Sequence, residues 1–182
     1  MSQKYAAYNA QGAIIGFYDD VDSPLPQGVT AIDITDAQWQ TCLSTPGCSV
    51  SGGALVAPSS AFLLTQAQAV QISSLTQAYA AAIAQPVSYT SKAGTVKTYQ
   101  ADPDSRGKLS DMLLACSGAQ ATPAGFYWLS VDNTQVPFAF ADLQGLAAVM
   151  GAQGFTAFAH LQTQKAEVRA ATTADSVAAI VW

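Results

Sequence analysis

Few residues of this chain could carry out chemistry, and they are scattered along it. His160 is the single histidine among 182 residues, and no cysteine or carboxylate stands at metal-ligand spacing from it. Ser105 and Ser130 could act as nucleophiles only beside a general base, and no motif brings His160 to either of them. The sequence therefore predicts no catalytic residue, no metal ligand and no cofactor. We expect His160 on a helix surface or against the core.

One group of carboxylates comes closest to acid–base chemistry. Asp102, Asp104 and Asp111 follow one another within ten positions. Asp102 directly precedes Pro103, however, and that order is typical of a helix N-cap and first helical residue. Two of the three aspartates stand where this helix begins, and anionic side chains stabilise the positive end of a helix, so we interpret the group as capping and not as acid–base chemistry. Arg106, four positions beyond Asp102, is expected to be a structural salt-bridge partner.

A second acidic group and the cysteines also have structural interpretations. Asp19, Asp20 and Asp22 lack the ligand spacing and the bidentate glutamate of a calcium loop, so they indicate a solvated connector. The odd number and wide spacing of the cysteines indicate buried, reduced thiols. A disulfide across the end of the first helix is sterically conceivable, but we do not expect it. The three cysteines are Cys42, Cys48 and Cys116.

The low charge content limits which classes of partner the chain is expected to bind. Only 10% of the residues are charged, compared with about 25% in a typical soluble domain, and the net charge is −5. No cluster of lysine and arginine exists to neutralise phosphates, which argues against nucleic acid and against an anionic membrane surface. No signal peptide and no membrane-spanning segment is predicted, so we expect a cytoplasmic protein. Scarce charge also favours self-association or a stable protein partner.

The sequence patterns predict an α+β fold with antiparallel strands. Residues 1–57 are predicted to form a small β-rich module: two strands around an Asn/Gly turn, a third strand, a short helix over 36–44, and a Gly-Gly hairpin. The helix has a capping box of Thr35 and Gln38, and Ile34 and Trp39 are placed to form a hydrophobic staple. Residues 58–64 are predicted to be a linker.

Residues 65–182 are predicted to form a mostly helical domain with inserted hairpins. A helix begins at the capping box of Thr65 and ends at Pro86, and a second helix follows Asp102. Two hairpins are expected, near 87–101 and 126–138. The remaining helices are predicted to be broken near Gly151 and Gly154. Beyond that break, the spacing of Phe155, Phe158, Leu161, Lys165 and Val168 predicts a further helix.

Aromatic side chains are the candidates for binding. The small first module has more rings than it can bury, so some are expected to form an exposed patch for a partner. Phe126, Tyr127 and Trp128 are consecutive, so in a strand they point to both faces and at least one is exposed or covered by a partner. The predicted partner-binding residues are Tyr5, Tyr8, Phe17, Tyr18, Trp39, Tyr127 and Trp128.

Segments of the first half resemble the N-terminal part of tail fibre assembly chaperones of Mu-like and related bacteriophages and of prophage-derived tail particles (tailocins). They are residues 5–20, 34–39 and 52–58, and the most specific pieces are Gly-Phe-Tyr-Asp and Ile-Thr-Asp-x-x-Trp. Motifs of the second half are similar to an uncharacterised (DUF4376-like) domain often found in such phage proteins. These motifs are residues 99–106, 125–128, 132–133 and 141–145.

The resemblance implies a chaperone that binds a trimeric phage tail fibre protein at its distal end and promotes its folding and trimerisation. A permanent structural component of the fibre tip, retained in the virion, is the alternative. A chaperone role is physically coherent, because non-local strand pairing in a fibre is slow and exposed to aggregation. Such a role requires a shaped surface and no catalytic group, so the chain is not expected to be an enzyme.

Overall fold

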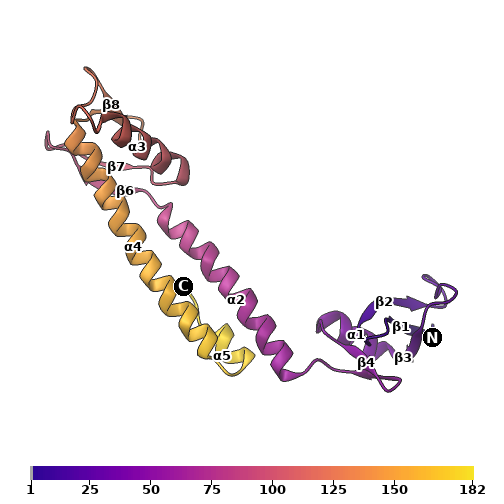
Figure 1. Ribbon diagram of the computed structural model, residues 1–182. Helices are drawn as coiled ribbons and strands as arrows, with labels where there is room; N and C mark the ends of the chain where they lie inside the picture. Colours follow the sequence, from indigo (N-terminus) through magenta and orange to yellow (C-terminus); the bar gives the residue numbers. More distant parts are fainter. Residues whose placement is uncertain (1) are drawn as a thin grey trace. The chain divides into compact units, whose positions relative to one another are not determined.

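The computed structural model describes residues 2–182 and has an α+β fold, as expected from the sequence (Figure 1). The chain divides into two compact units. The N-terminal unit comprises residues 2–68 with 172–174, and the C-terminal unit comprises residues 69–171 with 175–182. The boundary falls inside a helix, whereas the sequence patterns place it in a linker at 58–64.

The N-terminal unit contains the predicted strands and the short helix. Strand β1 lies between β2 and β3 in an antiparallel sheet of order β2-β1-β3, and β4 pairs with β5 in a separate hairpin. The elements are β1 (Lys4–Tyr8), β2 (Ile14–Asp19), β3 (Ala31–Ile34), α1 (Asp36–Ser44), β4 (Ser49–Ser51) and β5 (Ala54–Val56). The expected Asn/Gly and Gly-Gly hairpins are therefore confirmed.

The start of α1 is the predicted capping box. Gln38 N donates to Thr35 Oγ1 at 3.2 Å, and Thr35 N donates to Gln38 Oε1 at 2.8 Å. These two bonds satisfy backbone donors that a helix start otherwise leaves free. Helix α1 is only partly buried: Cys42 is 7% exposed, but Leu43 is 53% exposed.

Helix α2 (Ser60–Ile83) begins five positions before the predicted capping box, so the predicted linker is largely helical. Phe62 N donates to Ser59 Oγ, which satisfies a donor at the helix start. Thr65 lies inside the helix, where its hydroxyl donates to Ala61 O. The earlier start is reasonable because residues 61–64 are Ala, Phe, Leu and Leu, and none of them breaks a helix.

The C-terminal unit contains the predicted helices and hairpins. Its remaining elements are β6 (Val87–Thr90), β7 (Val96–Tyr99), α3 (Pro103–Cys116), β8 (Tyr127–Leu129), β9 (Gln135–Pro137), α4 (Phe140–Ala170) and α5 (Ala174–Ala178). Strands β6 and β7 form one antiparallel hairpin, and β8 and β9 form another. Rings and aliphatic side chains from both hairpins, α3 and the first half of α4 form one core around the fully buried Tyr99.

Helix α4 corrects one prediction. It runs without interruption over 31 residues, so the break predicted near Gly151 and Gly154 does not occur. Each glycine costs a helix about 1 kcal/mol, but burial of Met150 and Leu161 on either side of the pair offsets that cost. Phe155, at the start of the second predicted segment, is 74% exposed.

In the C-terminal unit, residues 69–83 of α2 lie alongside α4 (Figure 1). The rings of Tyr79 and Phe158 meet edge to face with centroids 6.4 Å apart, and Gln153 Nε2 donates to Ala82 O. Among residues 2–182, no helix combines the length and the apolar character that crossing a bilayer requires.

Candidate aromatic binding pocket

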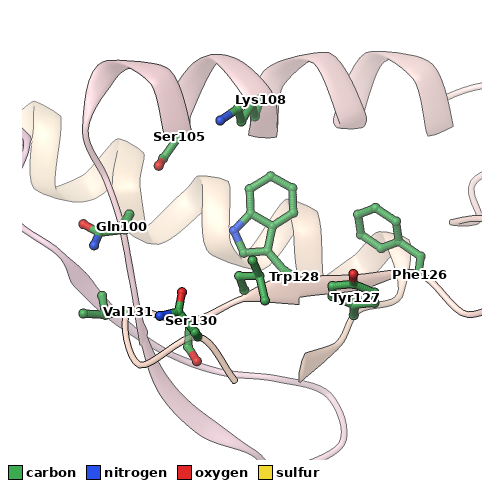
Figure 2. A pocket seen from close by; sticks show the side chains of 10 residues that line it. Gln100, Ser105, Lys108, Phe126, Tyr127, Trp128, Ser130 and Val131 are labelled. Carbon is green, nitrogen blue, oxygen red and sulfur yellow. The ribbon is translucent and has the colours of Figure 1, made fainter. Parts of the chain in front are cut away.

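The most developed concave site of the C-terminal unit lies between α3 and β8 (Figure 2). It is an open cavity of about 560 Å³ with aromatic and aliphatic walls and a rim of hydroxyl, amide and ammonium groups. We call it the α3–β8 pocket. Its lining residues are Gln100, Ser105, Lys108, Phe126, Tyr127, Trp128, Leu129, Ser130, Val131 and Asn133.

Trp128 stands at the centre of the pocket. Its indole projects from β8 toward α3 and faces Ser105 (Figure 2). Its ring is stacked near Phe138 at a centroid distance of 6.5 Å and an interplanar angle of 21°, and Phe126 lies 6.3 Å away. Because Phe138 is buried and belongs to the core, these contacts place one side of the indole against the core. A ring held in this way loses little conformational entropy when it binds a partner.

The β8–β9 turn is fixed by a small polar network. Lys97 Nζ contacts Asp132 Oδ2 at 2.7 Å and Thr134 Oγ1 at 3.1 Å, and Ser130 Oγ donates to Asp132 Oδ1. The Lys97 ammonium, together with the hydroxyl donors, holds the pKa of the Asp132 carboxyl well below its usual range. Val131 N also donates to Thr98 O at 2.8 Å, which joins the turn to β7. The rim of the pocket is therefore tied to the core hairpin.

The helix wall is positioned by the cap of α3. Asp102 is the N-cap: its Oδ1 accepts hydrogen bonds from Asp104 N and Ser105 N, and its Oδ2 accepts one from Ser105 Oγ at 2.7 Å. These donors lower the pKa of the Asp102 carboxyl. Lys108, one turn further, forms an exposed ion pair with Asp104. The capping interpretation of Asp102 is confirmed.

Arg106 does not have the expected role. No carboxylate of the described chain lies within salt-bridge distance of it. Its guanidinium instead donates to Ile83 O, Ala101 O and Met150 O and to Gln153 Oε1, at 2.7 to 3.2 Å. Arg106 thus joins the end of α2 and the middle of α4 to α3, because its planar fork can reach several carbonyls at once.

The predicted binding residues fall in two groups. Tyr127 and Trp128 both border the α3–β8 pocket. The Trp128 ring lies in it, whereas the Tyr127 ring lies on the opposite side of β8 (Figure 2) and is 45% exposed. At least one of the three consecutive rings is therefore exposed, as predicted. The other five belong to the N-terminal unit and are all partly buried in its sheet and helix: Tyr5, Tyr8, Phe17, Tyr18 and Trp39.

Contacts in the N-terminal unit use several of these rings structurally. Tyr5 and Tyr18 are cross-strand neighbours, and Lys4 Nζ lies 4.5 Å from the centroid of the Trp39 ring. Lys4 also pairs with Asp19. That part of the predicted acidic connector is not simply solvated: Asp19 Oδ1 accepts bonds from Val21 N and Asp22 N, and these donors lower its pKa to about 2.

The N-terminal unit has its own shallow cavity, of about 430 Å³, beside the cysteines. Cys42, Cys48 and Phe17 line it together with Phe62. All three cysteines of the chain are buried and free, as predicted. Burial, reinforced by the neighbouring Cys48 thiol, raises the pKa of Cys42 to about 12, so this thiol is a poor nucleophile at neutral pH.

His160 lies on the exposed surface of α4, where its ring meets Trp182 edge to face at 4.8 Å. A helix-surface position was one of the two expected. Within residues 2–182, no group of three histidine, cysteine or carboxylate side chains is arranged to hold a metal ion.

Comparison with protein families assigns most of the chain to a known family. Residues 66–181 match the family described as "Domain of unknown function (DUF4376)". The chain belongs to this family. The matched segment contains every residue that lines the α3–β8 pocket, so the pocket is part of the DUF4376 domain. Comparisons with curated proteins and with solved structures give no match.

Some residues that line the α3–β8 pocket were not predicted from the sequence. Gln100, Lys108 and Asn133 line it, but none was predicted. Ser105 and Lys108 stand three positions apart on a predicted helix, so their shared face could have been found. The approach of that face to Trp128 depends on tertiary packing and has no local signal.

Proposed function

We propose that this protein binds another polypeptide without breaking a covalent bond, and that the partner is a trimeric phage tail fibre protein whose folding and trimerisation it promotes. The observation that carries the proposal is the α3–β8 pocket with its fixed indole. A preoriented tryptophan beside apolar walls and a polar rim is typical of a protein-binding hot spot. The polar groups of Gln100, Ser105 and Asn133 suit the backbone of an extended segment.

Two further observations support this assignment. The N-terminal residues resemble those of tail fibre assembly chaperones, and the scarcity of charge makes an apolar protein partner more favourable than an ionic ligand. A chaperone of this kind would act in the host bacterial cytoplasm. The alternative is a permanent component of the fibre tip. Mass spectrometry of purified particles separates the two, because a transient chaperone leaves the fibre and a structural component stays.

Co-expression with the adjacent fibre gene tests the proposal. We expect the fibre to be soluble and trimeric only when this chain is present. Trp128→Ala and Tyr127→Ala should each weaken fibre binding, and Trp128→Ala by at least about 30-fold, because truncation of a central aromatic anchor costs about 2 kcal/mol or more. The measurement is titration calorimetry with purified fibre.

Leu114→Ala provides a matched control, because Leu114 is 76% exposed on α3 and does not line the pocket. Its binding should equal that of the wild type. Circular dichroism should show that each variant remains folded. Trp128→Phe, which keeps a ring beside Phe138 but removes the larger indole, covers the case in which Trp128→Ala unfolds the unit. Equal fibre trimerisation with and without the chain would refute the chaperone function.

A further inference from the structure

The helix pair of the C-terminal unit has an unusual surface. No aspartate, glutamate, lysine or arginine occurs between residues 37 and 91 or between residues 143 and 164. These ranges include all of α2 and most of α4. Exposed helices normally carry charged residues opposite their apolar stripe. The outer faces of residues 69–83 and 143–164 therefore offer no electrostatic repulsion to an identical face.

An aromatic side chain protrudes from this surface. Phe155 is 74% exposed, and Phe158, one turn further along α4, is 48% exposed. The exposed residues next to them are small: Ala152 and Ala159 lie within four positions of Phe155. A phenylalanine that projects from such a flat surface leaves a large apolar area in water unless something covers it.

The same helix pair contains a cavity. It measures about 490 Å³, and its walls are largely apolar. His160 and Trp182, whose rings are in edge-to-face contact, lie at its border. We call it the α2–α4 cavity. The residues that line it are Ala82, Ala152, Gln153, Thr156, Ala157, His160 and Trp182.

We propose that two copies of this chain pair through this surface, with Phe155 of each copy inserted into the α2–α4 cavity of the other. The positions are compatible with a twofold axis. Phe155 directly precedes Thr156 and lies three positions after Ala152, and both of these residues line the cavity. The protruding ring and the cavity therefore occupy adjacent strips of one helix, and crossing two α4 helices near residue 155 satisfies both contacts reciprocally.

The size and chemistry of the surface favour a second copy as the occupant. With a rise of about 1.5 Å per residue and a width of about 10 Å per helix, the two uncharged segments offer on the order of 500 Å² per copy, and about 1,000 Å² in total. That area reaches the lower limit of a specific interface. Residues 69–83 and 143–164 contribute no charge with which to select an acidic or basic partner, whereas they carry both halves of a complementary contact.

Sedimentation velocity of the full chain tests the inference. We expect the wild type to sediment with twice the 18.8 kDa mass of one chain at micromolar concentration. Phe155→Glu should raise the dissociation constant of the dimer at least 30-fold. Ala152→Trp, which fills the cavity, should do the same while Phe155 is intact. Leu114→Glu, at a residue of similar exposure on α3, should leave the dimer unchanged.

Two results would overturn the inference. A wild-type chain that is monomeric at 100 µM has no such interface. A monomer in which Phe155→Glu abolishes fibre binding would assign the surface to the fibre and not to a second copy. The outcome is independent of the proposed function, because fibre binding is tested at Trp128 in the α3–β8 pocket and pairing is tested at Phe155.

Discussion

At the scale of single residues, one carboxylate organises much of the C-terminal core. Asp142 is 2% exposed and accepts hydrogen bonds from Ala139 N, Lys92 N and the Tyr89 hydroxyl. It therefore caps α4 and holds the β6–β7 turn against that helix. Burial and the Asp142 charge raise the pKa of Tyr89, which keeps its hydroxyl as a donor. Gly145 lies one turn further along α4 and leaves room for the Tyr89 ring.

Gly145→Ala should destabilise the C-terminal unit. A Cβ at this position would lie 2.3 Å from the Tyr89 hydroxyl oxygen, so the ring must shift and its bond to Asp142 is lost. We expect a cost of about 1–3 kcal/mol in the free energy of unfolding, measured by urea denaturation. Gly154→Ala in the same helix meets no atom within 4 Å and should stabilise by about 0.5–1 kcal/mol. Equal effects of the two substitutions would contradict the packing described here.

Asp19 should make the stability of the N-terminal unit depend on pH. Its pKa in the folded chain is about 2, below the usual 3.8, because backbone N–H groups and Lys4 stabilise the carboxylate. A lowered pKa contributes stability that is fully present above about pH 4 and is lost as the pH falls toward 2. Thermal melts should show wild type more stable than Asp19→Asn at pH 7 and the difference shrinking between pH 4 and 2. A difference between the two chains that stays constant from pH 7 to pH 2 would contradict this role of Asp19.

At the scale of elements, Arg106 joins three helices. Its guanidinium satisfies carbonyl groups at the end of α2 and in the middle of α4, and its own backbone belongs to the first turn of α3. The carbonyls at a helix C-terminus have no partner within the helix, so a charged donor there is favourable. Removal of the Arg106 side chain should therefore weaken the packing of the three helices within the C-terminal unit.

Arg106→Met should lower the free energy of unfolding by at least about 2 kcal/mol, because it leaves several buried carbonyls without a donor. Arg169→Met, in the exposed last turn of α4, is the matched control and should change it by less than about 0.5 kcal/mol. Chemical denaturation followed by circular dichroism measures both. A small effect of Arg106→Met would mean that water replaces the guanidinium at these carbonyls.

Element types were predictable from sequence where local chemistry dominates. The capping box of Thr35 and Gln38 located α1, and Asp102 with Pro103 located the start of α3, because both signals act within one turn. Predictions failed where packing overrides propensity. Two glycines in α4 weaken the isolated helix, but neighbouring buried side chains keep it continuous.

At the scale of the whole molecule, charge is the distinguishing property. Only 10% of the residues are charged, and the proposed contact surfaces are formed mainly by rings, aliphatic groups and amides. Association through such surfaces is driven by burial of apolar area, which is nearly insensitive to screening by salt at moderate concentration.

The proposed binding to a fibre protein should therefore depend weakly on ionic strength. Between about 0.05 and about 0.5 M NaCl, we expect the dissociation constant to change by less than about threefold, because few exposed ion pairs are broken or formed. Biolayer interferometry with immobilised fibre measures this directly. A tenfold or larger weakening over the same range would show that charged groups such as Lys108 carry the interaction.

The α+β class, the starts of α1 and α3, and the hairpins could be predicted before the fold was known, because they depend on composition and on contacts within a few residues. Which aromatic rings are exposed to a partner depends on the tertiary packing. Phe155 follows the apolar spacing of a helix and is nevertheless exposed, and Trp128 faces α3 because distant elements pack around it. Helical periodicity shows which residues share a face, but only the packing of the other elements decides whether that face is covered.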